Sequence, residues 1–97
     1  MYKIDYSPVT EDHLRSLTKR QQVIVLETVE KQLSYQPDVE TRNRKPMRPN
    51  PLAPWELRIG NLRVFYDIDD REKVIFILAV GIKDRNIIRI GKEVIEL

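Results

Sequence analysis

The residues from Trp55 to Asp67, WELRIGNLRVFYD, hold two alternating segments joined by a turn signal. Apolar or aromatic residues recur at every second position in 55–59 and again in 62–68, a period that places alternate side chains on opposite faces of a strand. Gly60-Asn61 lies between them, with glycine at the first central position, as a type II′ turn requires. This stretch therefore predicts a tight β-hairpin.

A two-residue turn also fixes which residues of this hairpin face each other. It places Ile59 opposite Leu62 and Arg58 opposite Arg63, so two arginines meet across the strands. Like charges directly opposite on a sheet cost about 0.2–1 kcal/mol, so this pair needs an explanation. A phosphate would provide one, because guanidinium groups bind phosphate oxygens bidentately.

The neighbours of the two arginines support two different interpretations. Phe65 lies beside them in the register and offers a surface on which a nucleobase can stack. Glu56 and Asp67 lie on the same face and can neutralise the pair, which would leave an ordinary solvated surface. Residue types alone favour the second interpretation.

Upstream of the hairpin, the sequence predicts a strand and two helices. Alternation in 2–6 is typical of a strand, and Ser7-Pro8 can cap and begin a helix that reaches about Leu17. Thr18 followed by Gln21 forms a capping box for a second helix that ends near Tyr35. The two helices are expected to form a hairpin on one face of the sheet.

Between the helices and the hairpin, and after the hairpin, the patterns change. Residues 36–54 hold five of the six prolines and predict a long, semi-rigid loop. Residues 73–80 are almost continuously apolar, which predicts a buried central strand that ends at Gly81. A short strand at 87–90 and a tail at 94–97 follow. The predicted fold class is α+β, with the helical hairpin packed on an antiparallel meander.

Composition limits what this chain can be. Its 97 residues, 41% of them hydrophobic and 33% charged, suit one compact domain spanning residues 1–97. The longest apolar run, 74–80, is too short to span a bilayer, and no basic and apolar leader opens the sequence, so a cytoplasmic location is expected. With no cysteine and one histidine, we expect no disulfide, metal or cofactor.

Basic residues cluster in two segments outside the hairpin, at 42–48 and 83–92. The first lies in the proline-rich loop and can contact a nucleic-acid backbone, although charge runs are more often solvated surface. Its basic residues are Arg42, Arg44, Lys45 and Arg48.

The hairpin, followed by ILAVG at Ile77–Gly81, resembles the RelE/ParE superfamily of type II toxins. The resemblance covers most of the chain and implies the strand, helical hairpin, loop and meander order described above. In this superfamily, RelE-like members are ribosome-dependent endoribonucleases that cleave mRNA without a metal, while ParE-like members poison DNA gyrase. The resemblance implies a cognate antitoxin as partner, with ribosome and mRNA or gyrase as target. A degenerate member that only binds its antitoxin is a third alternative.

The resemblance also assigns candidate catalytic residues. Arg58 and Arg63 match basic positions of the RNA-cleaving branch and are expected to stabilise charge on the phosphorane. Lys83 or Arg85 matches the basic residue that follows the glycine, and Lys83 is the candidate acid or base if neighbouring cations favour its neutral form. Arg89 stands where that branch often has a tyrosine, so the proton-transfer and stacking role of the tyrosine is missing.

Overall fold

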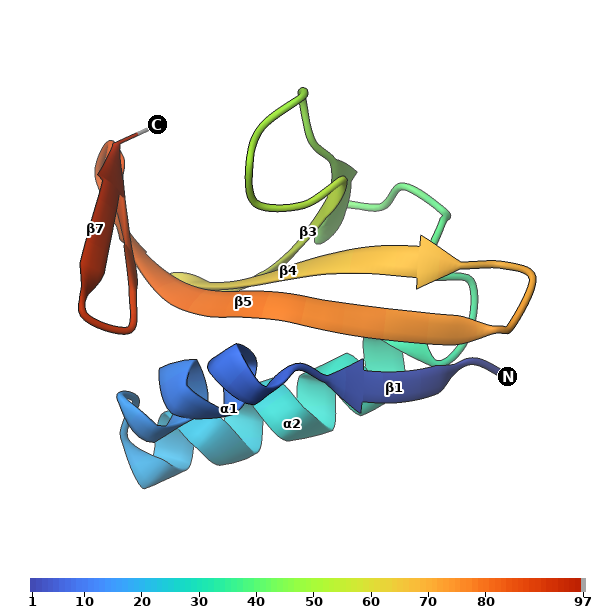
Figure 1. Cartoon of the computed structure of the whole chain (residues 1–97), viewed down its shortest axis with the longest axis horizontal. Coiled ribbons are helices and arrows are strands. Elements are labelled where there is room, and N and C mark those ends of the chain that lie inside the picture. Colours follow the sequence, from blue (N-terminus) through green and yellow to red (C-terminus); the bar gives the residue numbers. More distant parts are fainter. Residues whose placement is uncertain (97) are drawn as a thin grey trace.

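The computed structural model describes residues 1–96 and confirms the α+β class. Two helices lie against a curled sheet in which β3, β4, β5, β6 and β7 form an antiparallel series (Figure 1). The elements are β1 (Lys3–Tyr6), α1 (Pro8–Arg15), α2 (Lys19–Leu33), β2 (Arg44–Pro46), β3 (Trp55–Ile59), β4 (Leu62–Asp69), β5 (Val74–Asp84), β6 (Ile87–Ile90) and β7 (Glu93–Glu96).

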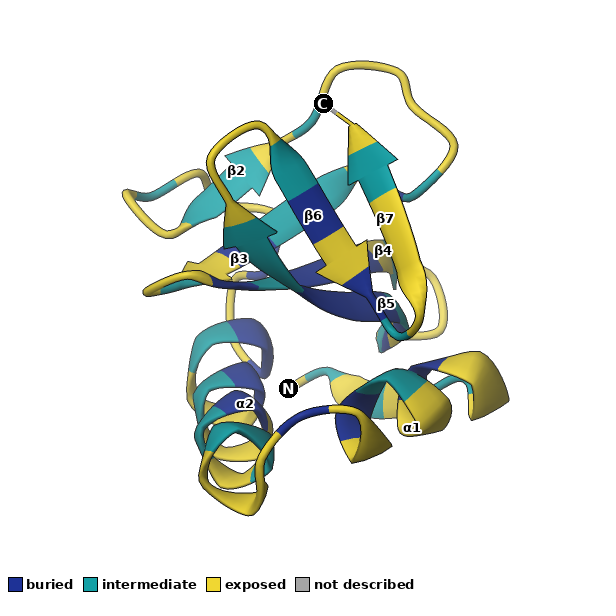
Figure 2. Cartoon of the chain, turned by 90° about the vertical axis from the view of Figure 1, so that its left-hand side faces the viewer, coloured by how far each residue is buried: buried dark blue, intermediate teal, exposed yellow. Residues whose placement is uncertain are grey.

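Strand β5 organises the sheet, whose order is β2-β3-β4-β5-β6-β7. One edge of β5 pairs with β4, and the other edge is shared, because β1 runs parallel to residues 74–77 and β6 runs antiparallel to residues 82–84. The helices cover one face. On the opposite face, β2–β3 and β6–β7 curve away from the helices (Figure 2), so that face is concave.

Both helices begin where the sequence predicts. The Ser7 side chain accepts a hydrogen bond from the Thr10 backbone N–H at 3.2 Å, with proline at the first helical position. Thr18 and Gln21 form the reciprocal capping box of α2. These bonds satisfy backbone donors that the first turn leaves without partners.

The hairpin register is confirmed across its whole length. Trp55 lies opposite Tyr66, and Arg58 lies opposite Arg63. The predicted type II′ turn needs a positive φ only at its first central residue. Gly60 has φ +59°, and the φ of Asn61 is not positive. Trp55 and Tyr66 stack with ring centroids 6.0 Å apart, and the Tyr66 hydroxyl donates to the Pro37 carbonyl at 2.9 Å.

The sheet carries a hydrophobic core on each face. The core under the helices includes Val29, Leu57 and Ile77, all fully buried. A second core lies on the concave face, where the proline-rich loop and the β6–β7 hairpin cover the sheet. Its buried members are Ala53, Phe65, Ala79, Ile88 and Ile90.

Three sequence expectations need correction. Gly81 does not end the central strand, because β5 continues to Asp84. Strand β6 lies so close over Gly81 that a Cβ there would come within 2.9 Å of the Ile88 and Ile90 side chains. The loop at 36–54 contains the short strand β2, and the expected tail forms β7, although Leu97 lies outside the described residues.

Candidate nucleic-acid interface

The concave face of the sheet carries a group of charged residues that we call the arginine face. Arg58 and Arg63 point there because the flanking Leu57 and Val64 belong to the core under the helices. Lys83 leaves β5 on the same side, two residues after Gly81, which lies opposite Arg63. Strand pairing adds Lys45 on β2, opposite Glu56 on β3. The arginine face therefore comprises Lys45, Glu56, Arg58, Arg63 and Lys83.

Glu56 joins the two arginines. Its Oε1 accepts a hydrogen bond from Arg58 Nε at 2.7 Å and lies 3.3 Å from Arg63 Nε. The Glu56 and Arg63 side chains are only 12% and 11% exposed, whereas that of Arg58 is 47% exposed. Two cations that would repel each other across the strands are thus held by one carboxylate.

Arg63 is fixed more firmly than Arg58. Its Nη1 donates to the carbonyl oxygens of Gly60 and Leu62 at 2.7 and 2.9 Å, in addition to the contact with Glu56. Burial lowers the pKa of the Arg63 guanidinium, as does the charge of Arg58, while Glu56 raises it. Arginine titrates so far above neutrality that the group stays charged. Arg63 is a rigid cation, and Arg58 is an accessible one held by Glu56.

Phe65 is not a stacking surface for a base, contrary to the sequence expectation. It lies on the predicted face, but it is fully buried in the second core. The sheet curls there, and Ile88 and Ile90 of β6 belong to the same buried cluster. The alternation of residues in the hairpin correctly predicted the face on which Phe65 lies. It could not predict that the proline-rich loop and β6 cover Phe65 on that face.

The basic loop at 42–48 divides into structural and accessible cations. Arg44 clamps the loop onto the end of α2, donating from Nη1 to the Gln32 carbonyl at 2.8 Å and from Nε to the Val39 carbonyl at 3.0 Å. These bonds engage the Arg44 guanidinium within the protein, so it is not a free cation of the loop. Lys45 lies 3.5 Å from Glu40, while Arg42 and Arg48 are exposed.

The remaining candidate residues are Arg89, which is not brought to the arginine face, and Arg85, which follows the last paired residue of β5. Arg89 pairs with Ile82, whose side chain packs against the core under the helices, so Arg89 leaves β6 on that other side of the sheet. Arg85 lies in the turn between β5 and β6. Both are exposed. The predicted catalytic set is therefore split, with Arg58, Arg63 and Lys83 on one face.

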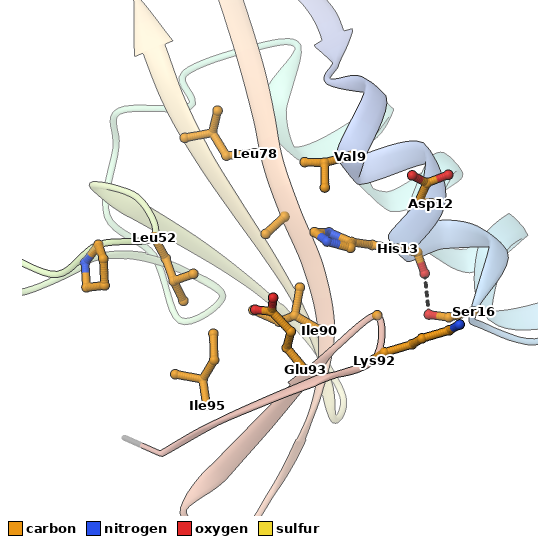
Figure 3. A pocket seen from close by; sticks show the side chains of 13 residues that line it. Val9, Asp12, His13, Ser16, Leu52, Leu78, Ile90, Lys92, Glu93 and Ile95 are labelled. Carbon is orange, nitrogen blue, oxygen red and sulfur yellow. Dashed lines mark hydrogen bonds between the residues drawn. The ribbon is translucent and has the colours of Figure 1, made fainter.

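A cavity of about 580 Å³ lies between α1, the proline-rich loop and the β6–β7 hairpin (Figure 3). The His13 ring reaches into it from α1, and its Nδ1 accepts a hydrogen bond from the Val80 backbone N–H at 3.4 Å. Burial lowers the pKa of His13, although the carboxylates of Asp12 and Glu93 act in the opposite direction. No sequence signal indicated this cavity, because its walls are far apart in the chain.

The comparisons with known proteins identify the family. Residues 4–87 match the family described as the ParE toxin of the type II toxin–antitoxin system parDE. The chain belongs to this family of toxins. No curated protein matches the sequence.

Two solved structures have the same fold. The toxin–antitoxin complex RelBE2 from Mycobacterium tuberculosis contains a chain 28% identical to this toxin, with a TM-score of 0.73, and the match covers 84% of this chain and 98% of that chain. The archaeal RelE–RelB complex from Pyrococcus horikoshii OT3 matches at 24% identity and a TM-score of 0.69, covering 87% and 97%. In the described residues of the toxin, neither helix has the length and apolarity needed to cross a bilayer.

Proposed function

We propose that this toxin inhibits translation as a metal-independent, ribosome-dependent mRNA endonuclease acting in the cytoplasm. The observation that supports the proposal is the arrangement of Arg58, Arg63 and Lys83 on one concave face, with Arg58 open to solvent. Cations that share one face suit a phosphodiester backbone, which guanidinium and ammonium groups bind through its anionic oxygens.

The proposed roles follow from how each side chain is held. Arg58 contacts the scissile phosphate, and the rigid Arg63 supplies positive charge where the phosphorane develops. In the proposed step the ribose 2′-hydroxyl attacks the phosphorus and gives its proton to water, while the bond to the 5′-oxygen breaks. Lys83 is the candidate proton donor to that leaving oxygen, because it shares this face and is partly accessible. The exposed Arg42 and Arg48 in the loop are proposed to contact the RNA backbone.

We further propose that a cognate antitoxin neutralises this toxin. Both solved structures described above are toxin–antitoxin complexes, which supports a partner of the same kind here.

The test is induction of the toxin alone, with mRNA 5′ ends mapped in the cells and on purified programmed ribosomes. Wild type is expected to produce new cuts within translated codons. Arg58→Gln is expected to lose most of this cleavage, and Lys83→Met is the companion variant for the proton-donor role. Arg20→Gln, an exposed cation on α2, is the matched control and should cleave like wild type. Intact mRNA with wild type would overturn the proposal, and cleavage by Lys83→Met at the wild-type rate would remove Lys83 from it.

Gyrase inhibition is the second candidate, because the family that residues 4–87 match is that of the ParE toxin, and three features of the arginine face weigh against cleavage. Glu56 neutralises part of the arginine charge, Phe65 is buried, and Arg89 lies on the other side of the sheet. These features reduce the free positive charge and the stacking surface of the face, and a protein-binding role needs both less than RNA cleavage does. Growth arrest with intact mRNA, together with loss of supercoiling by purified gyrase, would establish this alternative, and normal growth would indicate a member that only binds its antitoxin.

A further inference from the structure

We infer that Glu56 is an internal competitor for the phosphate that Arg58 and Arg63 bind. The inference deepens the proposed function and takes from it the assumption that the ligand of this face is a nucleic-acid strand. Arg58 Nε donates a hydrogen bond to Oε1 of Glu56 at 2.7 Å, and Arg63 Nε lies within ion-pair distance of the same oxygen, at 3.3 Å. An anionic phosphate oxygen seeks the same donors, so the carboxylate occupies the place that the ligand needs.

The hydrogen bonds of Arg63 make this competition direct. Its Nη1 is already committed to the carbonyl oxygens of Gly60 and Leu62, and its Nε faces Glu56. Only Nη2 has no contact among the described residues. A phosphate held bidentately by Nε and Nη2 of Arg63 therefore meets Glu56 at Nε, and a phosphate that also takes Nε of Arg58 displaces the same carboxylate.

The structure also offers a place for the displaced carboxylate. Lys45 lies directly opposite Glu56 on β2, and its present contact with Glu40 is long, at 3.5 Å. A Glu56 side chain that leaves the arginines can pair with Lys45 without becoming an isolated charge. Glu56 thus keeps the two arginines together in the free toxin and lowers its affinity for nucleic acid until a correctly placed phosphate displaces it.

The experiment measures the Kd of the purified toxin for a fluorescent single-stranded 2′-O-methyl hexanucleotide, which cannot be cleaved, at low salt. Glu56→Gln is expected to bind about fivefold more tightly, because the phosphate no longer has to displace a carboxylate from the two arginines, a contact worth about 1 kcal/mol between charges about 4 Å apart in water. Asp67→Asn is the matched control, with the same change in net charge on an exposed residue that makes no ion pair with either arginine. We expect its Kd to change less than twofold.

Unchanged or weaker binding by folded Glu56→Gln would overturn the inference. If that variant does not fold, the Nε–H resonances of Arg58 and Arg63 in the wild type provide the answer. Both are expected to shift as the hexanucleotide is added, and two unmoved resonances would overturn the inference. The binding measurement contains no ribosome, so it is independent of the cleavage test. If mRNA is not cleaved in the cleavage test, only the proposed function is refuted. If mRNA is cleaved on ribosomes but Glu56→Gln binds the hexanucleotide like wild type, only the competitor role is refuted.

Discussion

The two faces of the sheet are covered in different ways. The helix-covered face is filled by α2 and the alternating apolar residues of β3 and β4, and its buried members include Val29, Leu57 and Val64. The concave face is covered by the proline-rich loop and by the β6–β7 hairpin, which place Phe65 in a second core beside the charged residues. Local periodicity describes the first face well, but the second face depends on segments that curl back onto the sheet.

The largest expected effect tests whether the concave face is a true core. Phe65→Ala should lower the free energy of unfolding by about 3–5 kcal/mol, because it removes a fully buried ring and leaves a cavity. Leu57→Ala, in the helix-covered core, provides the comparison at about 2–5 kcal/mol. Urea unfolding measures both. A loss below about 1 kcal/mol for Phe65→Ala would mean that this face is open to water and that only the helix-covered core supports the fold.

Local signals predicted most elements of the fold to within a few residues, but not the strands β2 and β7. The hairpin at 55–68, the caps at Ser7 and Thr18 and the strand at 87–90 all followed from short-range patterns. The extension of β5 past Gly81 did not, because its cause is the close approach of β6. Gly81 is needed in that strand because residues 88–90 of β6 pack too close to it to leave room for a Cβ.

The site was predictable only where the hairpin alone determines it. Register gave the Arg58 and Arg63 pair, and the same register made Glu56 a possible neutralising partner. The burial of Phe65 and the use of Arg44 as a clamp arise from contacts that close the sheet and the loop. Such contacts leave no periodic pattern in a single sequence.

A smaller effect separates the two arginines of the concave face. Arg63→Gln should lower the free energy of unfolding by about 1.5–3 kcal/mol, because its charged hydrogen bonds are largely shielded from solvent. Arg58→Gln should cost less than about 1 kcal/mol, because its exposed guanidinium has only the Glu56 contact. Thermal and urea unfolding of the two variants give the comparison. Equal losses would show that the rigid and accessible roles assigned to these arginines are wrong.

The smallest expected effect concerns His13, where α1 meets the β6–β7 hairpin. Its Nδ1 can accept the Val80 N–H only while it carries no proton, and burial lowers the pKa of the folded histidine below its ordinary value of 6.5. As the pH falls below 6.5, the unfolded chain therefore binds the proton before the folded protein does. The stabilisation that neutral His13 gives the folded protein is complete above that pH and is lost as the pH falls through the folded pKa. His13→Asn cannot titrate, and the difference in its unfolding midpoint from wild type should shrink between pH 7.5 and pH 5.5. The carboxylates of Asp12 and Glu93 oppose the shift, which is why the slope should be shallow. A constant difference across this range would show that protonation of His13 does not weaken the contact between the helix and the strands that close the concave face.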